Sequence, residues 1–217
     1  MDFDALERLA ERLMAKRKPH VQRERGSVYF HGLRVSRGVI QLRKMVSSDN
    51  SHDPYLRAAA LFHDVGKGME PHASIGAAIM RDQLKGYMAA DEIEEVARLI
   101  ACHDDRKPDS RKHDLPTRLL QDADLLDHYG TQEIFMCFSY SAVHERGMST
   151  ALDFYRNDFK KIVNRHRKML NFKESQQIFD EKYRFQREFI KRLKLENEGG
   201  YMPVKGGEPI NFDFDID

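Results

Sequence analysis

The chain has 217 residues, of which 41% are hydrophobic and 33% are charged, a composition typical of one globular domain with a sizeable core. Its formal net charge of +1 excludes a strongly basic nucleic-acid binder, so any anion must bind at a local site. Two cysteines are too few for a disulfide framework, and no run approaches the roughly 18 apolar residues of a membrane span. Residues 1–19 lack the apolar core of a signal peptide. We therefore expect a cytoplasmic protein.

The N-terminal part of the chain predicts two helices separated by a basic loop. Apolar residues recur at helical spacing within residues 4–16, and a basic segment broken by Pro19 follows. The next helix opens near Tyr29, and His31 lies on its apolar stripe four residues before Val35. A histidine in such a position is more often a hydrogen-bonded core residue than a metal ligand.

The segment around which the chain is organised is an apolar helix that ends in a His-Asp pair. The run from Tyr55 to Phe62 is apolar, and His63 and Asp64 continue its buried face. Burying an imidazole beside a carboxylate is costly unless a partner satisfies both groups, and a metal ion suits both. Lys67, which stands between two glycines, adds one flexible cation beside the pair. A metal ion with a lysine at its edge suits phosphate chemistry.

Three further segments have apolar residues at helical spacing: 71–86, 91–103 and 116–130. His72 lies in the first turn of the first segment, and His103 ends the inward stripe of the second. Asp124 in the third segment is flanked by leucines and alanine, so its carboxylate is hard to solvate and needs a cation. Asp127 follows one turn later on the same face, where it can orient a ligand or accept a proton.

The remainder of the chain predicts three longer helices, over residues 131–145, 150–170 and 174–195. Aromatic residues recur at helical spacing in them, and we expect these side chains, including Phe135, Phe138 and Tyr140, to belong to the core. The segment 196–217 contains two glycine pairs and two prolines, which predicts an irregular tail.

Almost no segment alternates with period two, so these elements predict an all-α, single-domain helical bundle. Five separate helical segments each bring a histidine or an aspartate to an apolar stripe. Independent structural roles explain five such coincidences poorly, whereas a metal site between the central helices of a bundle explains them together. The predicted parts are an N-terminal helix and basic loop, a metal-binding core, helices that complete the same domain, and a tail: residues 1–25, 26–130, 131–195 and 196–217.

The order of a histidine, a His-Asp pair followed by Gly-Lys, and a distant aspartate resembles the HD superfamily of metal-dependent phosphohydrolases, over about residues 31–127. Segments 119–127 and 164–170 are similar to the compact bacterial branch of that superfamily, some members of which are nucleotide pyrophosphohydrolases. The resemblance implies a first metal ion held by His31, His63, Asp64 and Asp124. In dinuclear members two further histidines hold a second ion, here His72 and His103, with Asp64 bridging the two ions.

The resemblance and the residues together predict hydrolysis of a phosphoester or phosphoanhydride bond by a metal-activated water. The expected substrate is a nucleotide or a related small phosphorylated molecule. Asp64, Lys67 and Asp127 are the expected catalytic residues, with Lys67 on a substrate phosphate. The expected cofactor is one or two divalent ions of Mn, Fe, Co, Ni or Zn, with Mg also open.

Two other functions stay open at this point. Some proteins with a similar six-ligand HD set are di-iron oxygenases acting on a small organic substrate, and an HD module can also bind a ligand without catalysis. Retention of every ligand together with Lys67 argues against a module that only binds. We expect neither a nucleic-acid duplex nor a membrane as partner, and a homodimer stays open.

Overall fold

The computed structural model describes residues 1–106 and 112–203, which form ten α-helices and, among them, no strand. The prediction of an all-α fold is therefore confirmed. No helix among these residues is long and apolar enough to span a membrane. Most of the predicted tail, residues 204–217, lies outside the described residues. The helices are α1 (Phe3–Met14), α2 (Ser27–Val46), α3 (Asp53–Phe62), α4 (His72–Gln83), α5 (Ala90–Cys102), α6 (Leu115–Asp127), α7 (Thr131–Val143), α8 (Met148–Asn157), α9 (Phe159–Met169) and α10 (Lys173–Asn197).

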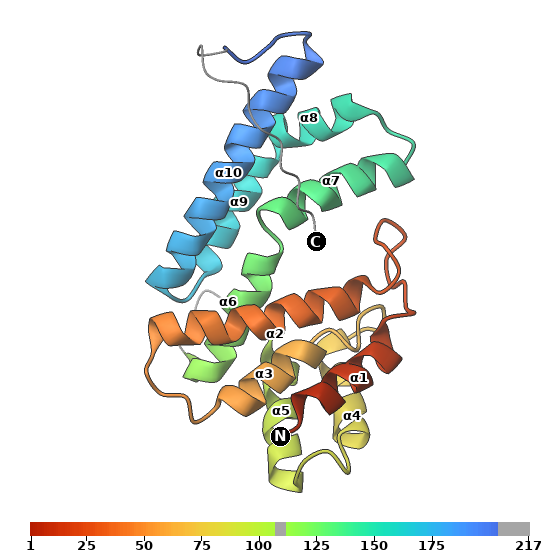
Figure 1. Ribbon diagram of the computed structural model, residues 1–217, viewed down its shortest axis with the longest axis vertical. Helices are drawn as coiled ribbons and strands as arrows, with labels where there is room; N and C mark the ends of the chain where they lie inside the picture. Colours follow the sequence, from red (N-terminus) through yellow and green to blue (C-terminus); the bar gives the residue numbers. More distant parts are fainter. Residues whose placement is uncertain (107–111, 204–217) are drawn as a thin grey trace, which may run out of the picture.

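Helix α2 is the central element of the bundle, with α1, α3, α4 and α5 on one side and α7 to α10 on the other (Figure 1). It packs against both α3 and α6, while α3 also packs against α5 and α4 against α5. Helix α1 covers α2 and α3, and α10 contacts α2, α6, α7 and α8. Helices α3 and α6 therefore pack directly on α2 in the middle of the molecule, and α5 packs on both α3 and α6.

Small residues let α2 and α3 approach each other closely beside His31. Ala58, Ala59 and Ala60 of α3 are fully buried. A Cβ atom at Gly32 of α2 would overlap the backbone oxygen of Leu61, so only glycine permits this crossing. Because His31 precedes Gly32, the close approach brings its side chain to the end of α3.

The predicted helix over residues 150–170 is two helices in the structure, α8 and α9, which is a correction. The break falls at Asp158, whose φ of −112° departs from helical geometry. Asn157 and Asp158 are weak helix formers because their side chains compete with the backbone for hydrogen bonds. The bend leaves the rings of Tyr155 and Phe159 edge to face, with centroids 5.2 Å apart.

The predicted core position of the aromatic residues in α7 is also wrong in part. Phe135 is 50% exposed and Tyr140 is 42% exposed, and the two residues that α7 buries are Glu133 and Ser141. Residues two positions apart lie about 200° apart on a helix. Once Glu133 faces inward, Phe135 must therefore face outward. Phe138 is half-buried against the ring of Phe189 in α10.

Candidate metal centre

Two histidines of the centre cap helix ends, and this fixes which ring nitrogen faces the site. His63 follows α3 and its Nδ1 lies 2.8 Å from the backbone oxygen of Ala60. His103 follows α5 and its Nδ1 lies 2.7 Å from the oxygen of Ile100. Because the last carbonyls of a helix lack intrahelical partners, they accept from Nδ1–H. The Nε2 lone pair of each ring is then left for a ligand-binding role.

His31 is oriented by a carboxylate instead. Its Nδ1 lies 2.7 Å from Oδ2 of Asp127 on α6. Asp127 also accepts hydrogen bonds from Nε and NH2 of Arg34, each at 2.9 Å. Burial would raise the pKa of Asp127, but the hydrogen bonds from His31 and Arg34 outweigh burial and lower it. Asp127 is thus an ionised group that holds the His31 ring from behind.

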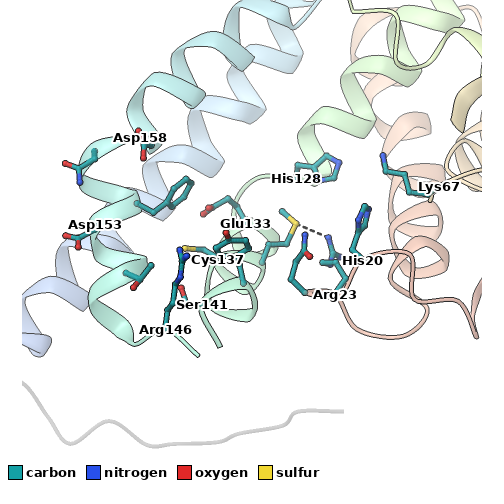
Figure 2. Close-up of a pocket in the computed structure, with 16 residues that line it drawn as sticks. His20, Arg23, Lys67, His128, Glu133, Cys137, Ser141, Arg146, Asp153 and Asp158 are labelled. Atoms are coloured by element: carbon teal, nitrogen blue, oxygen red, sulfur yellow. Dashed lines mark hydrogen bonds between the residues drawn. The ribbon is translucent and has the colours of Figure 1, made fainter. Parts of the chain in front are cut away.

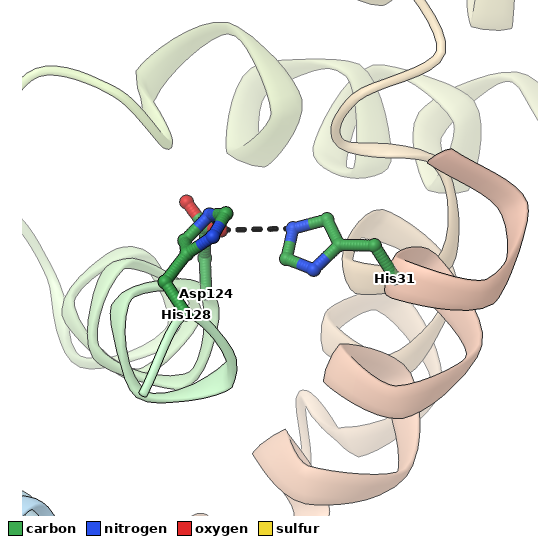
Figure 3. Close-up of side chains that lie close together, drawn as sticks. All are labelled: His31, Asp124 and His128. Atoms are coloured by element: carbon green, nitrogen blue, oxygen red, sulfur yellow. Dashed lines mark hydrogen bonds and ion pairs between the residues drawn. The ribbon is translucent and has the colours of Figure 1, made fainter. Parts of the chain in front are cut away.

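The first group of converging donor atoms comes from α2, the end of α3, and α6. Nε2 of His31 lies 3.1 Å from Nε2 of His63 and 3.0 Å from Oδ1 of Asp124. Nε2 of His63 lies 3.5 Å from the same carboxylate oxygen. Figure 3 shows His31 of α2 pointing toward Asp124 of α6. Two Nε2 lone pairs this close repel unless a proton or a cation lies between them.

The second group of donor atoms surrounds Asp64. Its Oδ1 lies 3.6 Å from Nε2 of His72 and 3.6 Å from Nε2 of His103. His72 Nε2 is buried and, among the described residues, has no hydrogen-bond partner. The other oxygen of Asp64, Oδ2, lies 4.0 Å from Nε2 of His63. Asp64 therefore belongs to both groups, and each group has the spacing that a metal ion needs.

The electrostatics of the site favour a cation. Burial would raise the pKa of Asp64 and of Asp124, but neighbouring histidines lower the first and Arg106 and His63 lower the second. Burial would lower the pKa of His31, but its hydrogen bonds to the carboxylates of Asp124 and Asp127 raise it to about 9. Two buried carboxylates thus face the imidazoles of the centre, and the carboxylates beside His31 favour its protonated form. This donor set fits one or two divalent transition-metal ions.

The structure brings all six predicted metal ligands together: His31, His63, Asp64, His72, His103 and Asp124. Lys67 lies at the rim, with Nζ 3.4 Å from Oδ1 of Asp64. Its turn is held by Arg17, which donates hydrogen bonds to the backbone oxygens of Val65 and Lys67. Asp127 lies behind His31 rather than among the donor atoms. The catalytic roles of these residues stay predictions.

The sequence analysis missed two residues of the centre, His128 and Arg106. Nε2 of His128 lies 3.4 Å from Oδ1 of Asp124, and Figure 3 shows the two side chains side by side. The spacing of four residues was the available signal, because such residues share a helix face. Arg106 donates to Oδ2 of Asp124 from the segment after α5, where no periodicity points to it.

A cavity of about 780 Å³ adjoins the rim of the centre. Lys67 and His128 line it at that rim together with His20 and Arg23 from the segment before α2, and side chains of α7 and α8 line much of the rest (Figure 2). This volume lies within the usual range for small-molecule pockets, roughly 300–1,000 Å³.

Replacing Asp127 with asparagine is expected to weaken metal affinity about 10- to 100-fold, because a neutral amide polarises the Nδ1–H of His31 less than a carboxylate does. Titration with Mn²⁺ or Co²⁺ against a chromophoric chelator measures the change. Asp53→Asn is the matched control, because Asp53 also pairs with an arginine, Arg43, but away from the centre. Equal affinities of the two variants would contradict the role given to Asp127.

Comparisons with known proteins identify a matching domain family and similar structures. Residues 28–129 match the HD domain family. No curated protein matches the chain. The structure of Bacillus subtilis YpgQ is similar, with 17% sequence identity and a TM-score of 0.64. The match covers 90% of this chain and 95% of YpgQ. YpgQ has also been solved in complex with ADP. An HD-superfamily hydrolase from Bacillus thuringiensis is similar at 22% identity, covers 90% of this chain and 98% of its own, and also has a TM-score of 0.64.

Proposed function

Because the chain is an HD-domain protein, we propose that it is a metal-dependent phosphohydrolase acting on a nucleotide or a related small phosphorylated substrate. The observation that carries the proposal is the position of Asp64. This one carboxylate is shared by two groups of donor atoms, and Lys67 lies 3.4 Å away at the mouth of a large cavity. A paired cation site with a lysine at its open edge is matched to a phosphate.

The proposed roles follow from where each side chain lies. His31, His63, Asp64 and Asp124 would hold one ion, and Asp64, His72 and His103 a second. Bound divalent ions supply Lewis acidity at a phosphoryl oxygen and acidify a coordinated water. Lys67 would bind a phosphate oxygen from the cavity side. Asp127 would keep the proton on Nδ1 of His31, so that Nε2 stays a ligand.

Two observations support a nucleotide as the substrate. The similar YpgQ structure was solved in complex with ADP. The cavity beside the centre is lined near its rim by His20, Arg23, Lys67 and His128. The cationic groups of Arg23 and Lys67 suit the negative charge of a phosphate chain, and the two imidazoles offer hydrogen-bonding nitrogens beside them.

The deciding experiment combines metal analysis with a screen for phosphate release. The purified protein is analysed for bound metals and then assayed on nucleoside mono-, di- and triphosphates with Mn²⁺, Co²⁺, Ni²⁺, Zn²⁺ and Mg²⁺. Adding a pyrophosphatase distinguishes release of pyrophosphate from release of phosphate. Bound transition metal with phosphate release supports the proposal. Bound iron with oxygen consumption and no phosphate release would indicate the oxygenase, and absence of metal and turnover would indicate a binding module.

Replacing Lys67 with methionine is expected to lower kcat/KM about 10- to 100-fold, because a charge-assisted contact to phosphate is lost while the length of the side chain is kept. Metal content should stay unchanged, since Lys67 is not one of the clustered donors. Lys85→Met is the matched control, because Lys85 is exposed and pairs only with Asp82 among the described residues. A wild-type kcat/KM in Lys67→Met would remove Lys67 from the substrate site.

A further inference from the structure

The cavity beside the centre has ends of opposite charge. Lys67, His128 and Arg23 lie at the end near the centre, and Asp153 and Asp158 of the α8 region lie at the other end (Figure 2). Arg146 also lines the cavity, beside Ser141 and Cys137. A nucleotide has the same polarity, because its phosphates are anionic and its base and sugar offer hydrogen-bond donors. The cavity volume of about 780 Å³ lies within the usual range for ligand pockets, roughly 300–1,000 Å³.

Glu133 of α7 lies between these two ends (Figure 2). It is one of only two residues that α7 buries, and it is 9% exposed. Oε2 accepts a hydrogen bond from Tyr155 of α8 at 3.1 Å and another from Gln186 of α10 at 2.8 Å. Both bonds end on the same oxygen. Glu133 thus has a fixed orientation, with Oε1 left for a molecule in the cavity.

Burial raises the pKa of Glu133 to about 7, although the bonds from Tyr155 and Gln186 act in the opposite direction. The titratable groups around it are Tyr129, Cys137 and Tyr155, and burial raises the pKa of all three. They therefore remain neutral near pH 7, and Gln186 does not titrate. Of these groups, Glu133 is the one that changes from a hydrogen-bond donor to an acceptor near neutral pH.

We propose that Glu133 forms a selective hydrogen bond with the exocyclic group of a nucleotide base bound in this cavity, while the phosphates lie at the Lys67 end. As a carboxylate, Oε1 accepts a hydrogen bond from a base amino group. As a carboxylic acid, the same position donates to a base carbonyl. The inference rests on the proposed phosphohydrolase function and adds a residue that determines specificity.

The test compares nucleotides that differ in that exocyclic group. Adenosine and inosine nucleotides form one pair, cytidine and uridine nucleotides a second, each with the phosphate chain that the screen finds to be cleaved. The kcat/KM of the nucleotide with the amino group is divided by that of the nucleotide with the carbonyl group, and competition experiments measure this ratio from about pH 6 to pH 8. The range spans the pKa of Glu133, about 7. Effects of pH on the metal centre and the phosphates cancel within a pair. The ratio should rise with pH, by about tenfold in one of the two pairs.

Glu133→Gln cannot titrate, so its ratio should not vary with pH. Asp153→Asn, which changes another carboxylate lining the same cavity, should keep the wild-type pH dependence. Tyr155→Phe removes a hydrogen bond that lowers the pKa of Glu133, so the midpoint should move to higher pH. If turnover is too low in a variant, dissociation constants of AMP and IMP with the metal-free protein give the same ratio.

The outcomes separate the two hypotheses. If phosphate is released but the kcat/KM ratio of the wild type does not vary with pH in either pair, the role of Glu133 alone is overturned. An unchanged pH dependence of that ratio in Glu133→Gln would overturn it as well. Failure to release phosphate from any nucleotide would instead overturn the proposed function. Thermal unfolding of each variant shows that the comparison is made between folded proteins.

Discussion

Asp64→Asn is expected to lose about 10³-fold or more in phosphate release and to keep at most about one of two bound ions. Asp64 lies near both groups, 3.6 Å from Nε2 of His72 and of His103 and 4.0 Å from Nε2 of His63. Asparagine preserves the shape of the side chain but removes the negative charge. A neutral amide is a poor ligand for a divalent ion and does not bridge two of them.

Metal content by mass spectrometry and the rate of phosphate release check this prediction together. Asp122→Asn is the matched control, because Asp122 is also a buried aspartate, only 1% exposed. Its carboxylate is not one of the clustered donor groups. Asp122 accepts hydrogen bonds from the backbone of Asn171 and Phe172, so its replacement should lower stability and leave metal binding intact. Two ions in purified Asp64→Asn would show that the carboxylate is not shared.

The clustering of the candidate metal ligands could be predicted because each is a polar residue on a strongly apolar stripe. His63 follows the apolar α3, His103 ends the inward stripe of α5, and both are buried in the structure. Periodicity alone indicates that such residues face inward, but not which helices they meet. The grouping into two sets that share Asp64 came from the resemblance to the HD superfamily, and the geometry agrees with it.

Residues whose partners lie far away in the chain could not be predicted in this way. Arg106 reaches Asp124 from an irregular segment, and periodicity does not indicate such a contact. Asp122 is buried on α6 because its partners are the backbone amides of residues 171 and 172. Glu133 is similar, since Tyr155 and Gln186 come from two other helices. Burial of a polar residue depends on tertiary partners that local spacing does not contain.

The second large effect is expected from Gly66→Ala, a change of one methyl group outside the donor set. Gly66 follows the His-Asp pair and lies against the first turn of α4, which His72 begins. A Cβ atom at Gly66 would overlap the backbone oxygen of His72 and lie 2.8 Å from the backbone nitrogen of Gly76. Backbone atoms cannot rotate away, so α4 must move as a whole.

That movement should separate His72 from Asp64 and disrupt the second donor group while leaving the first in place. We expect Gly66→Ala to lower the free energy of unfolding by about 1–3 kcal/mol and to keep about one bound ion, with Asp64 still present. Chemical denaturation and metal analysis measure the two effects. Gly38→Ala is the matched control, because no atom lies within 4 Å of a Cβ atom there, and alanine in a helix is about 0.5–1 kcal/mol more stable than glycine. Full occupancy by two ions in Gly66→Ala would mean that the second group tolerates a shift of α4. A loss of both ions would mean instead that the two groups form a single cooperative site.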